Sequence, residues 1–365
     1  MKVIRVGIIG QGRSGWGIHG SYIVKDDPRY RVVAVADRLA DRRAFAEKTY
    51  GCEAVANYRK LLARDDLDLV INASFSHQHP AITVAALEAG HNVLTEKPMA
   101  RRVADADRCI AAARKAGKVL AVYQQSRYAP YFQQVQKVIR SGVLGRIVQV
   151  SIRFNGHSRR WDWQTLKQYG GGNLLNTGPH PLDQALVLFG DGMPKVNCWM
   201  DRTEEGSFGN AENHVKLILS GRGHPTIDLE VSSCCAYPLF TYQVYGSRGG
   251  LSGTTQAMEW RYFKPREAPR QKLQKEPLRD DKGNPIYAKE TLKWYTEKWP
   301  AEVKGGGGAA YSSADAPKLG GMTGRFYSML YKTLTRGAPL EITPEQVRRQ
   351  VAVIEEAHRQ NRGAF

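Results

Sequence analysis

Short apolar runs alternate with amphipathic stretches along the first part of the chain. The apolar runs have the length of strands and lie at 3–9, 31–36, 67–73, 91–95 and 119–123. The stretches between them predict helices at 14–25, 40–50, 79–89 and 103–116. This alternation is typical of a parallel sheet whose strands are connected by helices. We therefore predict an α/β domain over residues 1–125.

The pattern changes after residue 125. A helix is predicted at 130–140, and the strand-like runs that follow it have few helices between them. These runs lie at 146–155, 195–201, 212–219, 226–235 and 241–246. Strands that follow one another directly favour antiparallel pairing. We therefore predict that residues 126–365 form an α+β domain with an open, mainly antiparallel sheet, which holds the substrate and contributes to oligomerisation.

A segment rich in proline and charge interrupts the second pattern at 258–320. It includes Gly305–Gly308 and cannot bury much apolar surface by itself. We interpret it as an extended arm or flap whose tryptophans and tyrosines favour docking, for example on a neighbouring subunit, although a loose surface loop fits as well. Helices follow at 322–336 and 344–361, the second with an N-terminal cap at Thr343. We expect this last helix to pack back on the first domain.

Composition and charge suit a folded two-domain protein. The chain has 365 residues, of which 42% are hydrophobic and 24% are charged. The net charge of +18 would suit a nucleic acid or an anionic ligand. The charges are dispersed, however, and the aromatic interleaving of single-strand binders is missing, so we rank nucleic-acid binding last.

Targeting signals and metal motifs are not evident in the sequence. No apolar run reaches the roughly 18 residues of a membrane helix, and the N-terminus reads as a strand, without a cleavage site. We therefore expect a cytoplasmic protein without a membrane partner. The cysteines at 52, 109, 198, 234 and 235 match no zinc spacing, so we predict free thiols and no metal site.

A glycine motif marks a dinucleotide site. Gly10, Gly12 and Gly15 form a GxGxxG pattern that follows a predicted strand and opens a predicted helix. Gly10 permits the tight turn, Gly12 lets a pyrophosphate approach the backbone, and Gly15 lets the helix pack closely on the strand. We therefore interpret the first domain as a Rossmann domain that binds NAD(P).

The choice between NAD and NADP depends on the end of the second strand. Asp37 ends this strand, about 20 residues after the motif, where a carboxylate binds the ribose hydroxyls. Asp37 would repel a 2′-phosphate and so favours NAD. Arg13 in the turn and Arg38 after the carboxylate could instead pair with that phosphate. We predict NAD, with NADP as the open alternative.

Two further segments carry candidate catalytic groups. Lys97, in Thr95–Pro98, follows a parallel strand and should face the nicotinamide crevice, where its ammonium can hydrogen-bond the reacting oxygen. His180 follows the glycines at 170–172 and can take a hydroxyl proton near neutral pH. If Gly178 and Pro179 open a helix, Asn176 caps it. A surface lysine and a structural histidine are the alternatives.

Together these motifs resemble the Gfo/Idh/MocA family of glucose–fructose oxidoreductases and inositol dehydrogenases. The resemblance runs from Gly7 to about Arg359. It implies a Rossmann domain followed by an open sheet, hydride transfer between NAD(P) and a sugar or cyclitol, and frequent homo-oligomers. Lys97 and His180 match the family's catalytic lysine and histidine. The resemblance also assigns Ser74, His79 and Glu96 to the cofactor site.

The sequence departs from the family pattern at two places. The family's Thr-Pro-Asn loop is replaced by residues 74–76, Ser-Phe-Ser, which alters packing near the nicotinamide. Asn176 stands where members often carry aspartate. An amide can orient a substrate hydroxyl but cannot act as a base, so proton transfer would rest on His180 or Lys97.

Several residues outside these motifs are candidates for reading the substrate. Aromatic rings stack on sugar faces, and arginine and aspartate hydrogen-bond sugar hydroxyls. The candidates are Arg127, Tyr128, Arg160, Trp161, Trp163, Asn176 and Asp183. Arg159 and Arg160 could instead pair a carboxylate or phosphate, and a structural role for the tryptophans fits equally well.

Three functions follow from these observations. The first is an NAD(P)-dependent oxidoreductase that acts on a ring hydroxyl of a sugar, glycoside or cyclitol, as a homodimer or homotetramer assembled through the second sheet. The second is a redox-neutral glycosidase or lyase that forms a transient keto-sugar. The third, from another class, is a non-catalytic dinucleotide-binding sensor or assembly protein.

Overall fold

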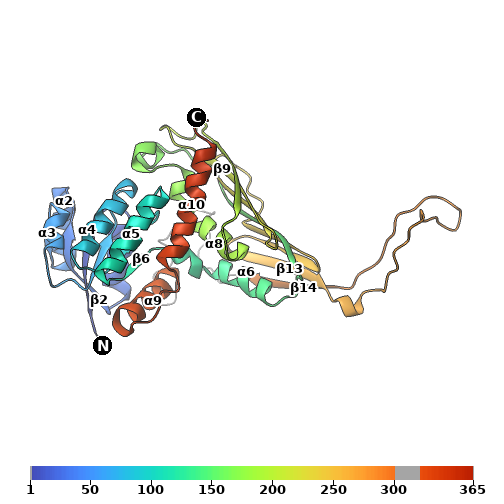
Figure 1. The fold of residues 1–365 in the computed structure, drawn as a ribbon, viewed down its shortest axis with the longest axis horizontal. Helices are drawn as coiled ribbons and strands as arrows, with labels where there is room; N and C mark the ends of the chain where they lie inside the picture. Colours follow the sequence, from blue (N-terminus) through green and yellow to red (C-terminus); the bar gives the residue numbers. More distant parts are fainter. Residues whose placement is uncertain (1, 301–320, 365) are drawn as a thin grey trace.

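The computed structural model describes residues 2–300 and 321–364, which form two sheets separated by helices (Figure 1). The strands of the first sheet are parallel, in the order β3-β2-β1-β4-β5-β6. They are β1 (Ile4–Ile9), β2 (Tyr30–Ala36), β3 (Glu53–Val55), β4 (Leu69–Asn72), β5 (Val93–Thr95) and β6 (Leu120–Val122). Its helices are α1 (Ser21–Asp26), α2 (Ala40–Tyr50), α3 (Tyr58–Leu62), α4 (His79–Glu88) and α5 (Val103–Ala116). This order is that of a Rossmann fold.

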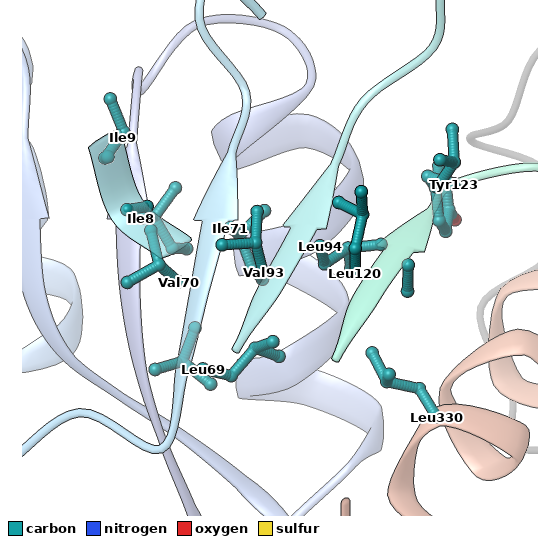
Figure 2. Packing of buried hydrophobic residues seen from close by; sticks show 14 of the residues in the cluster. Ile8, Ile9, Leu69, Val70, Ile71, Val93, Leu94, Leu120, Tyr123 and Leu330 are labelled. Carbon is teal, nitrogen blue, oxygen red and sulfur yellow. The ribbon is translucent and has the colours of Figure 1, made fainter. Parts of the chain in front are cut away.

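The first sheet is buried on both faces, which explains its nearly continuous apolar strands. Figure 2 shows buried side chains of β1, β4, β5 and β6, with a helix from the C-terminal part of the chain next to the β6 end of the sheet. That helix, α9 (Met322–Arg336), places Leu330 in this core. The Rossmann core is therefore completed by a segment some 200 residues further along the chain, as Tyr123 shows by its 2.8 Å hydrogen bond to Thr323.

The second sheet is mixed, in the order β14-β13-β12-β11-β7-β10-β9-β8. The strands are β7 (Ile147–Asn155), β8 (Lys195–Asp201), β9 (His214–Ser220), β10 (Thr226–Ser232), β11 (Tyr242–Gly246), β12 (Gly249–Gly253), β13 (Ala257–Phe263) and β14 (Trp294–Pro300). The β10–β7 pair is parallel and the other pairs are antiparallel among the described residues. The helices of this part are α6 (Pro130–Arg140), α7 (Asn173–Asn176) and α8 (Pro179–Phe189).

The last helix, α10 (Pro344–Gln360), lies between the two sheets (Figure 1). Thr343 and Gln346 form a reciprocal capping box at its start, as the sequence predicts for this cap. Val347 and Val351 pack into the Rossmann core, whereas Val353 and Ile354 pack into the core of the second sheet. The helix therefore packs on the first domain, as expected, and also on the second sheet.

The predicted fold class is confirmed, and the differences are local. The division at residue 125 stays a prediction. Two short elements, β3 and α3, have no predicted counterpart because three to five residues carry too little periodicity. The helix predicted at 14–25 begins as a π-helical turn over Gly15–Gly20 before α1.

The prediction of one arm over 258–320 is wrong at its start. Residues up to Phe263 belong to β13, where Met258 and Trp260 are buried with 3% and 7% exposure. Strand β14 returns beside β13, so the arm is the connection at 264–293, which projects away from the body (Figure 1). The remainder at 301–320, including Gly305–Gly308, lies outside the described residues. No helix within residues 2–300 and 321–364 is long and apolar enough to cross a membrane.

Candidate functional site

A cavity of about 710 Å³ is lined by both parts of the chain. The ends of the Rossmann strands form one wall, and the loops before α7 and α8 form the other. The predicted site residues that line it are Gly10, Gly12, Arg13, Asp37, Arg38, Ser74, His79, Glu96, Lys97, Arg160, Trp163, Asn176 and His180. The structure thus brings residues from widely separated motifs to one place.

The glycine turn meets the steric requirements predicted for it. Gly10 has a φ of +88°, and a Cβ there would lie 2.9 Å from the carbonyl carbon of Ala73. A Cβ on Gly15 would run into the carbonyl oxygen of Gly10, so Gly15 packs helix on strand without lining the cavity. Gly12 faces the cavity, where the guanidinium of Arg42 is its nearest neighbour, 3.4 Å from the Cβ position. The backbone there is open to a pyrophosphate.

The carboxylate of Asp37, which lines the cavity, is held in place by backbone hydrogen bonds. Its oxygens accept hydrogen bonds from the backbone N–H groups of Gln11, at 2.7 Å, and Leu39, at 2.9 Å. Arg42 lies 3.6 Å from the same carboxylate. Each oxygen retains a lone pair for a ribose hydroxyl, so the residues present fit a dinucleotide.

Lys97 lies where the two walls meet. Its Nζ donates a 2.7 Å hydrogen bond to the backbone carbonyl oxygen of Asn176. Burial lowers the pKa of the Lys97 ammonium, Glu96 opposes this change, and the guanidinium groups of Arg13 and Arg160 reinforce it. The amine is therefore closer to neutrality than an ordinary lysine.

A buried relay fixes the backbone at Lys97. The Tyr327 hydroxyl of α9 lies 2.7 Å from Nδ1 of His19, and Nε2 of His19 lies 3.1 Å from Oε1 of Glu96. Oε2 of Glu96 accepts the N–H of Lys97 at 3.1 Å. Burial alone would raise the pKa of Glu96, but the His19 hydrogen bond and the nearby positive charges lower it to about 2. Glu96 is thus a carboxylate that orients Lys97.

His180 lies in the first turn of α8 and is 6% exposed. Burial holds the pKa of its imidazole well below 6.5, and the charge of Lys97 acts in the same direction. The ring is therefore neutral at neutral pH. A neutral imidazole inside the cavity can accept a proton.

The prediction that Asn176 caps α8 is wrong. Asn176 ends the short helix α7, and the N-cap of α8 is Gly178, whose φ of −51° continues the helical path. The cause lies in the preceding loop. Gly172, with φ +107°, packs against the buried carboxylate of Glu212, which accepts the N–H of Leu174 at 3.1 Å and starts α7 early. Asn176 is thereby presented to Lys97 through its carbonyl oxygen.

Glu212 is a buried acid that no sequence motif marks. It is 3% exposed, and burial raises the pKa of its carboxyl to about 7. Its own carbonyl accepts the N–H of Asn173 at 3.0 Å. Glu212 therefore holds the start of α7, next to the glycine loop, through these hydrogen bonds.

An aromatic group joins the two walls near the predicted nicotinamide position. Phe75, which replaces the family's proline, meets Trp163 edge to face at 4.9 Å between centroids. Tyr169 stacks on Phe75 at 6.1 Å, and His77 lies beside both. In the loop after β4, the family's proline is thus replaced by Phe75, which contacts Trp163 on the other wall of the cavity.

Four predicted substrate residues lie outside the cavity lining. Arg127 forms a bidentate ion pair with Asp183, and Tyr128 donates a 2.8 Å hydrogen bond to Glu341. Trp161 is 78% exposed at the rim. The pair of Arg127 and Asp183 ties the end of the Rossmann domain to α8, and any substrate contact by these residues stays a prediction.

Several further lining residues have no signal in the sequence. They are Arg42, Tyr58, Gln78, Gln125, Gln164 and Thr177. Phe75 also lines the cavity, in the loop at 74–76 that departs from the family pattern. Among the described residues, no three His, Cys, Asp or Glu side chains are grouped to hold a metal ion.

The sequence matches two family models that together follow the two parts of the fold. Residues 4–124 match an oxidoreductase family with an NAD-binding Rossmann fold, and residues 132–252 match the GFO/IDH/MocA C-terminal domain. Residues 4–124 are therefore an NAD(P)-binding Rossmann domain.

Two curated relatives are enzymes that act on sugars. A D-glucoside 3-dehydrogenase of Escherichia coli (strain K12) is 34% identical over 193 residues, or 51% of this chain and 54% of that protein. A dTDP-3,4-didehydro-2,6-dideoxy-alpha-D-glucose 3-reductase of Actinomadura kijaniata is 32% identical over 252 residues, or 68% and 74%. The chain thus spans about half the length of the first relative and about three quarters of the second.

A solved structure shares the fold over the whole chain. The WlbA dehydrogenase from Bordetella pertussis, in complex with NADH and UDP-GlcNAcA, superimposes with a TM-score of 0.76 at 23% identity, covering 100% of this chain and 97% of that one. At this identity the likeness concerns the fold.

Proposed function

The chain belongs to the GFO/IDH/MocA family of oxidoreductases, and we propose that it transfers a hydride between NAD and a ring hydroxyl of a sugar, glycoside or cyclitol. One observation carries the proposal. A single cavity joins the glycine turn and Asp37 at one end to Lys97 and His180 at the other. The relatives named for glucosides and deoxysugars support a sugar as the substrate.

The two candidate catalytic side chains have complementary roles in this proposal. When NAD is bound, its nicotinamide supplies the hydride acceptor. Neutral His180 takes the proton of the substrate hydroxyl. Lys97 retains N–H donors beyond the one used for Asn176 and hydrogen-bonds the same oxygen as it becomes a carbonyl. Asn176, through its side chain, orients a neighbouring hydroxyl.

NAD is preferred because Asp37 is fixed by two backbone hydrogen bonds where the ribose hydroxyls would bind. Three arginines, Arg13, Arg38 and Arg42, line the same end of the cavity. Their guanidinium groups could pair with a 2′-phosphate, so NADP is the second cofactor in the proposal.

We also propose a homo-oligomer assembled through the second sheet. On one face of this sheet, Arg153 and Lys216 pair with Asp228 and Glu230, while the other face buries the apolar core. These ion pairs balance the charges on this face, so that a second copy can approach it. Light scattering of the purified protein would give the oligomeric state, and a monomer would contradict the proposal.

The first experiment follows NADH absorbance while sugars, glycosides and cyclitols are added to the protein with NAD. His180→Ala should lower the turnover number about 100-fold while NAD binding is retained, since His180 approaches the substrate end of the cavity. The exposed His157→Ala is the matched control and should leave turnover unchanged. Loss of NAD binding in His180→Ala would contradict the assigned role.

Two outcomes would redirect the proposal. Consumption of a glycoside with release of its aglycone, and without net NADH, would indicate the redox-neutral glycosidase. Retained NAD without turnover of any sugar would indicate the sensor or assembly protein.

A further inference from the structure

Two paired loops, which we call the rim, lie beside the cavity, and the first of them contributes lining residues. The loop at 156–165 and the loop at 202–211 are joined by backbone hydrogen bonds. The N–H of Arg160 donates to Gly206 at 2.9 Å, and the N–H of Phe208 donates back to Arg160 at 3.1 Å. Ala211 donates to Thr165 at 2.9 Å. The side chains on this rim are therefore carried by a paired backbone.

The rim exposes aromatic side chains that contact one another. Trp161 is 78% exposed and Phe208 is 57% exposed, and their ring centroids lie 6.5 Å apart with the rings nearly perpendicular. The guanidinium of Arg159 lies 5.0 Å from the Phe208 centroid and donates to the carbonyl of Glu205 at 2.9 Å. A lone exposed aromatic is ordinary on a protein surface. A pair in edge contact, buttressed by a cation, forms a platform.

This platform adjoins the proposed substrate position. Trp161 stands between Arg160 and Asp162, which both line the cavity and form an ion pair at 2.7 Å. Arg160 also donates a hydrogen bond to Gln164, another lining residue. The polar groups on the cavity side can hydrogen-bond sugar hydroxyls, while the adjoining aromatic faces offer an apolar surface to whatever extends out of the cavity.

We propose that Trp161 and Phe208, with Arg159, form an outer subsite for a second ring attached to the reacting sugar. The substrate class is then a glycoside with a cyclic substituent, either an aromatic aglycone or a second pyranose, rather than a free monosaccharide. Both substituents present a ring face that stacks on an aromatic side chain. The inference rests on the proposed function, because it takes the reacting ring to lie beside Lys97 and His180.

The test compares equilibrium binding of three ligands, by calorimetry, to the protein loaded with NADH, which cannot accept a hydride from them. They are methyl glucoside, a nitrophenyl glucoside and a glucosyl-glucose disaccharide. The wild-type protein should bind at least one two-ring ligand more tightly than methyl glucoside. Trp161→Ala should weaken that two-ring ligand roughly five- to tenfold, the size of one aromatic stacking contact, and leave methyl glucoside unchanged. Phe208→Ala should have a smaller effect in the same direction.

Trp199→Ala is the matched control, because Trp199 is 59% exposed on β8 and does not line the cavity. The ligand that loses affinity in Trp161→Ala distinguishes an aryl aglycone from a second sugar. Equal affinities for all three ligands, an equal loss for methyl glucoside, or a change of oligomeric state without a change in ligand preference would overturn the subsite. Selective binding without oxidation would leave the subsite standing and contradict the proposed reaction. If no glycoside binds, both are wrong.

Discussion

The two walls of the cavity are built in different ways. The wall proposed to bind the cofactor consists largely of backbone. A Cβ on Gly10 or Gly15 would run into backbone atoms, and the Asp37 carboxylate is held by two N–H groups. The substrate wall consists of long side chains on loops, such as Arg160, Trp163 and Gln164. A backbone wall suits a ligand that is always the same, whereas a side-chain wall can be rebuilt for each substrate without disturbing the fold. Cofactor binding should therefore be the conservative property of this molecule and substrate choice the variable one.

The largest effect is expected at Lys97, where the two walls meet, and it tests whether the two walls have separate roles. Lys97→Met should lower the turnover number about 10³-fold, within the usual range for acid–base catalysis, while NAD affinity stays near the wild-type value. Stopped-flow and fluorescence titration would measure the two quantities separately. The exposed Lys60→Met in α3 is the control. An equal loss of NAD affinity would mean that Lys97 belongs to the cofactor wall.

The second prediction concerns Glu212, the buried acid beside the glycine loop, and the pH dependence of stability. The pKa of Glu212 is raised in the folded protein from 4.5 to about 7, because burial penalises its ionised form. Its contribution to stability is thus present below pH 4.5 and is lost as the pH rises through 7. Glu212→Gln has no ionisable group here and avoids this loss. The free energy of unfolding of the variant minus that of the wild type should therefore increase by on the order of 3 kcal/mol between pH 5 and pH 9.

Chemical denaturation at both pH values would measure the effect of Glu212→Gln. Glu204→Gln, in the same loop and highly exposed, should show no such pH dependence. An advantage that does not change with pH would mean that the Glu212 carboxyl keeps the same charge in the folded and unfolded protein over this range.

The smallest expected effect concerns the part of the cofactor wall that is made of side chains. Arg42 is half-exposed beside Asp37, where an ion pair contributes at most about 1 kcal/mol. Arg42→Ala should raise the KM for NADP about fivefold and change the KM for NAD less. Arg31→Ala is the control, because Arg31 is exposed near the start of β2 and does not line the cavity. A larger loss for NAD would show that Arg42 orients Asp37 rather than binding a 2′-phosphate.

The cofactor wall could largely be predicted from the sequence because its determinants are local. The alternation of strands and helices, the glycine turn and Asp37 each depend on residues within one β-α-β unit. The contacts at the substrate end depend on residues far apart in the sequence. The contact between Phe75 and Trp163 and the hydrogen bond between His19 and Tyr327 have no signal in either segment alone.

The second sheet shows the same limit. Its central strands follow alternating apolar patterns and were predicted, but β12 is glycine-rich and β13 and β14 lie among prolines and charges. Their strand conformation depends on pairing with neighbouring strands of the sheet. The early start of α7 likewise depends on Glu212, which reaches the glycine loop only in the folded chain.

The placement of α10 has a consequence for how the molecule unfolds. Its first turns belong to one hydrophobic core and its later turns to the other. Gln350, near the change, is hydrogen-bonded both to Gln124, which follows β6, and to the carbonyl of Pro179 at the start of α8. If either core unfolds, α10 loses the apolar contacts that it makes there, and this destabilises the helix in the other core. Although the chain has two sheets, we therefore expect a single cooperative unfolding transition, and α10 fixes how the two sheets are placed relative to each other.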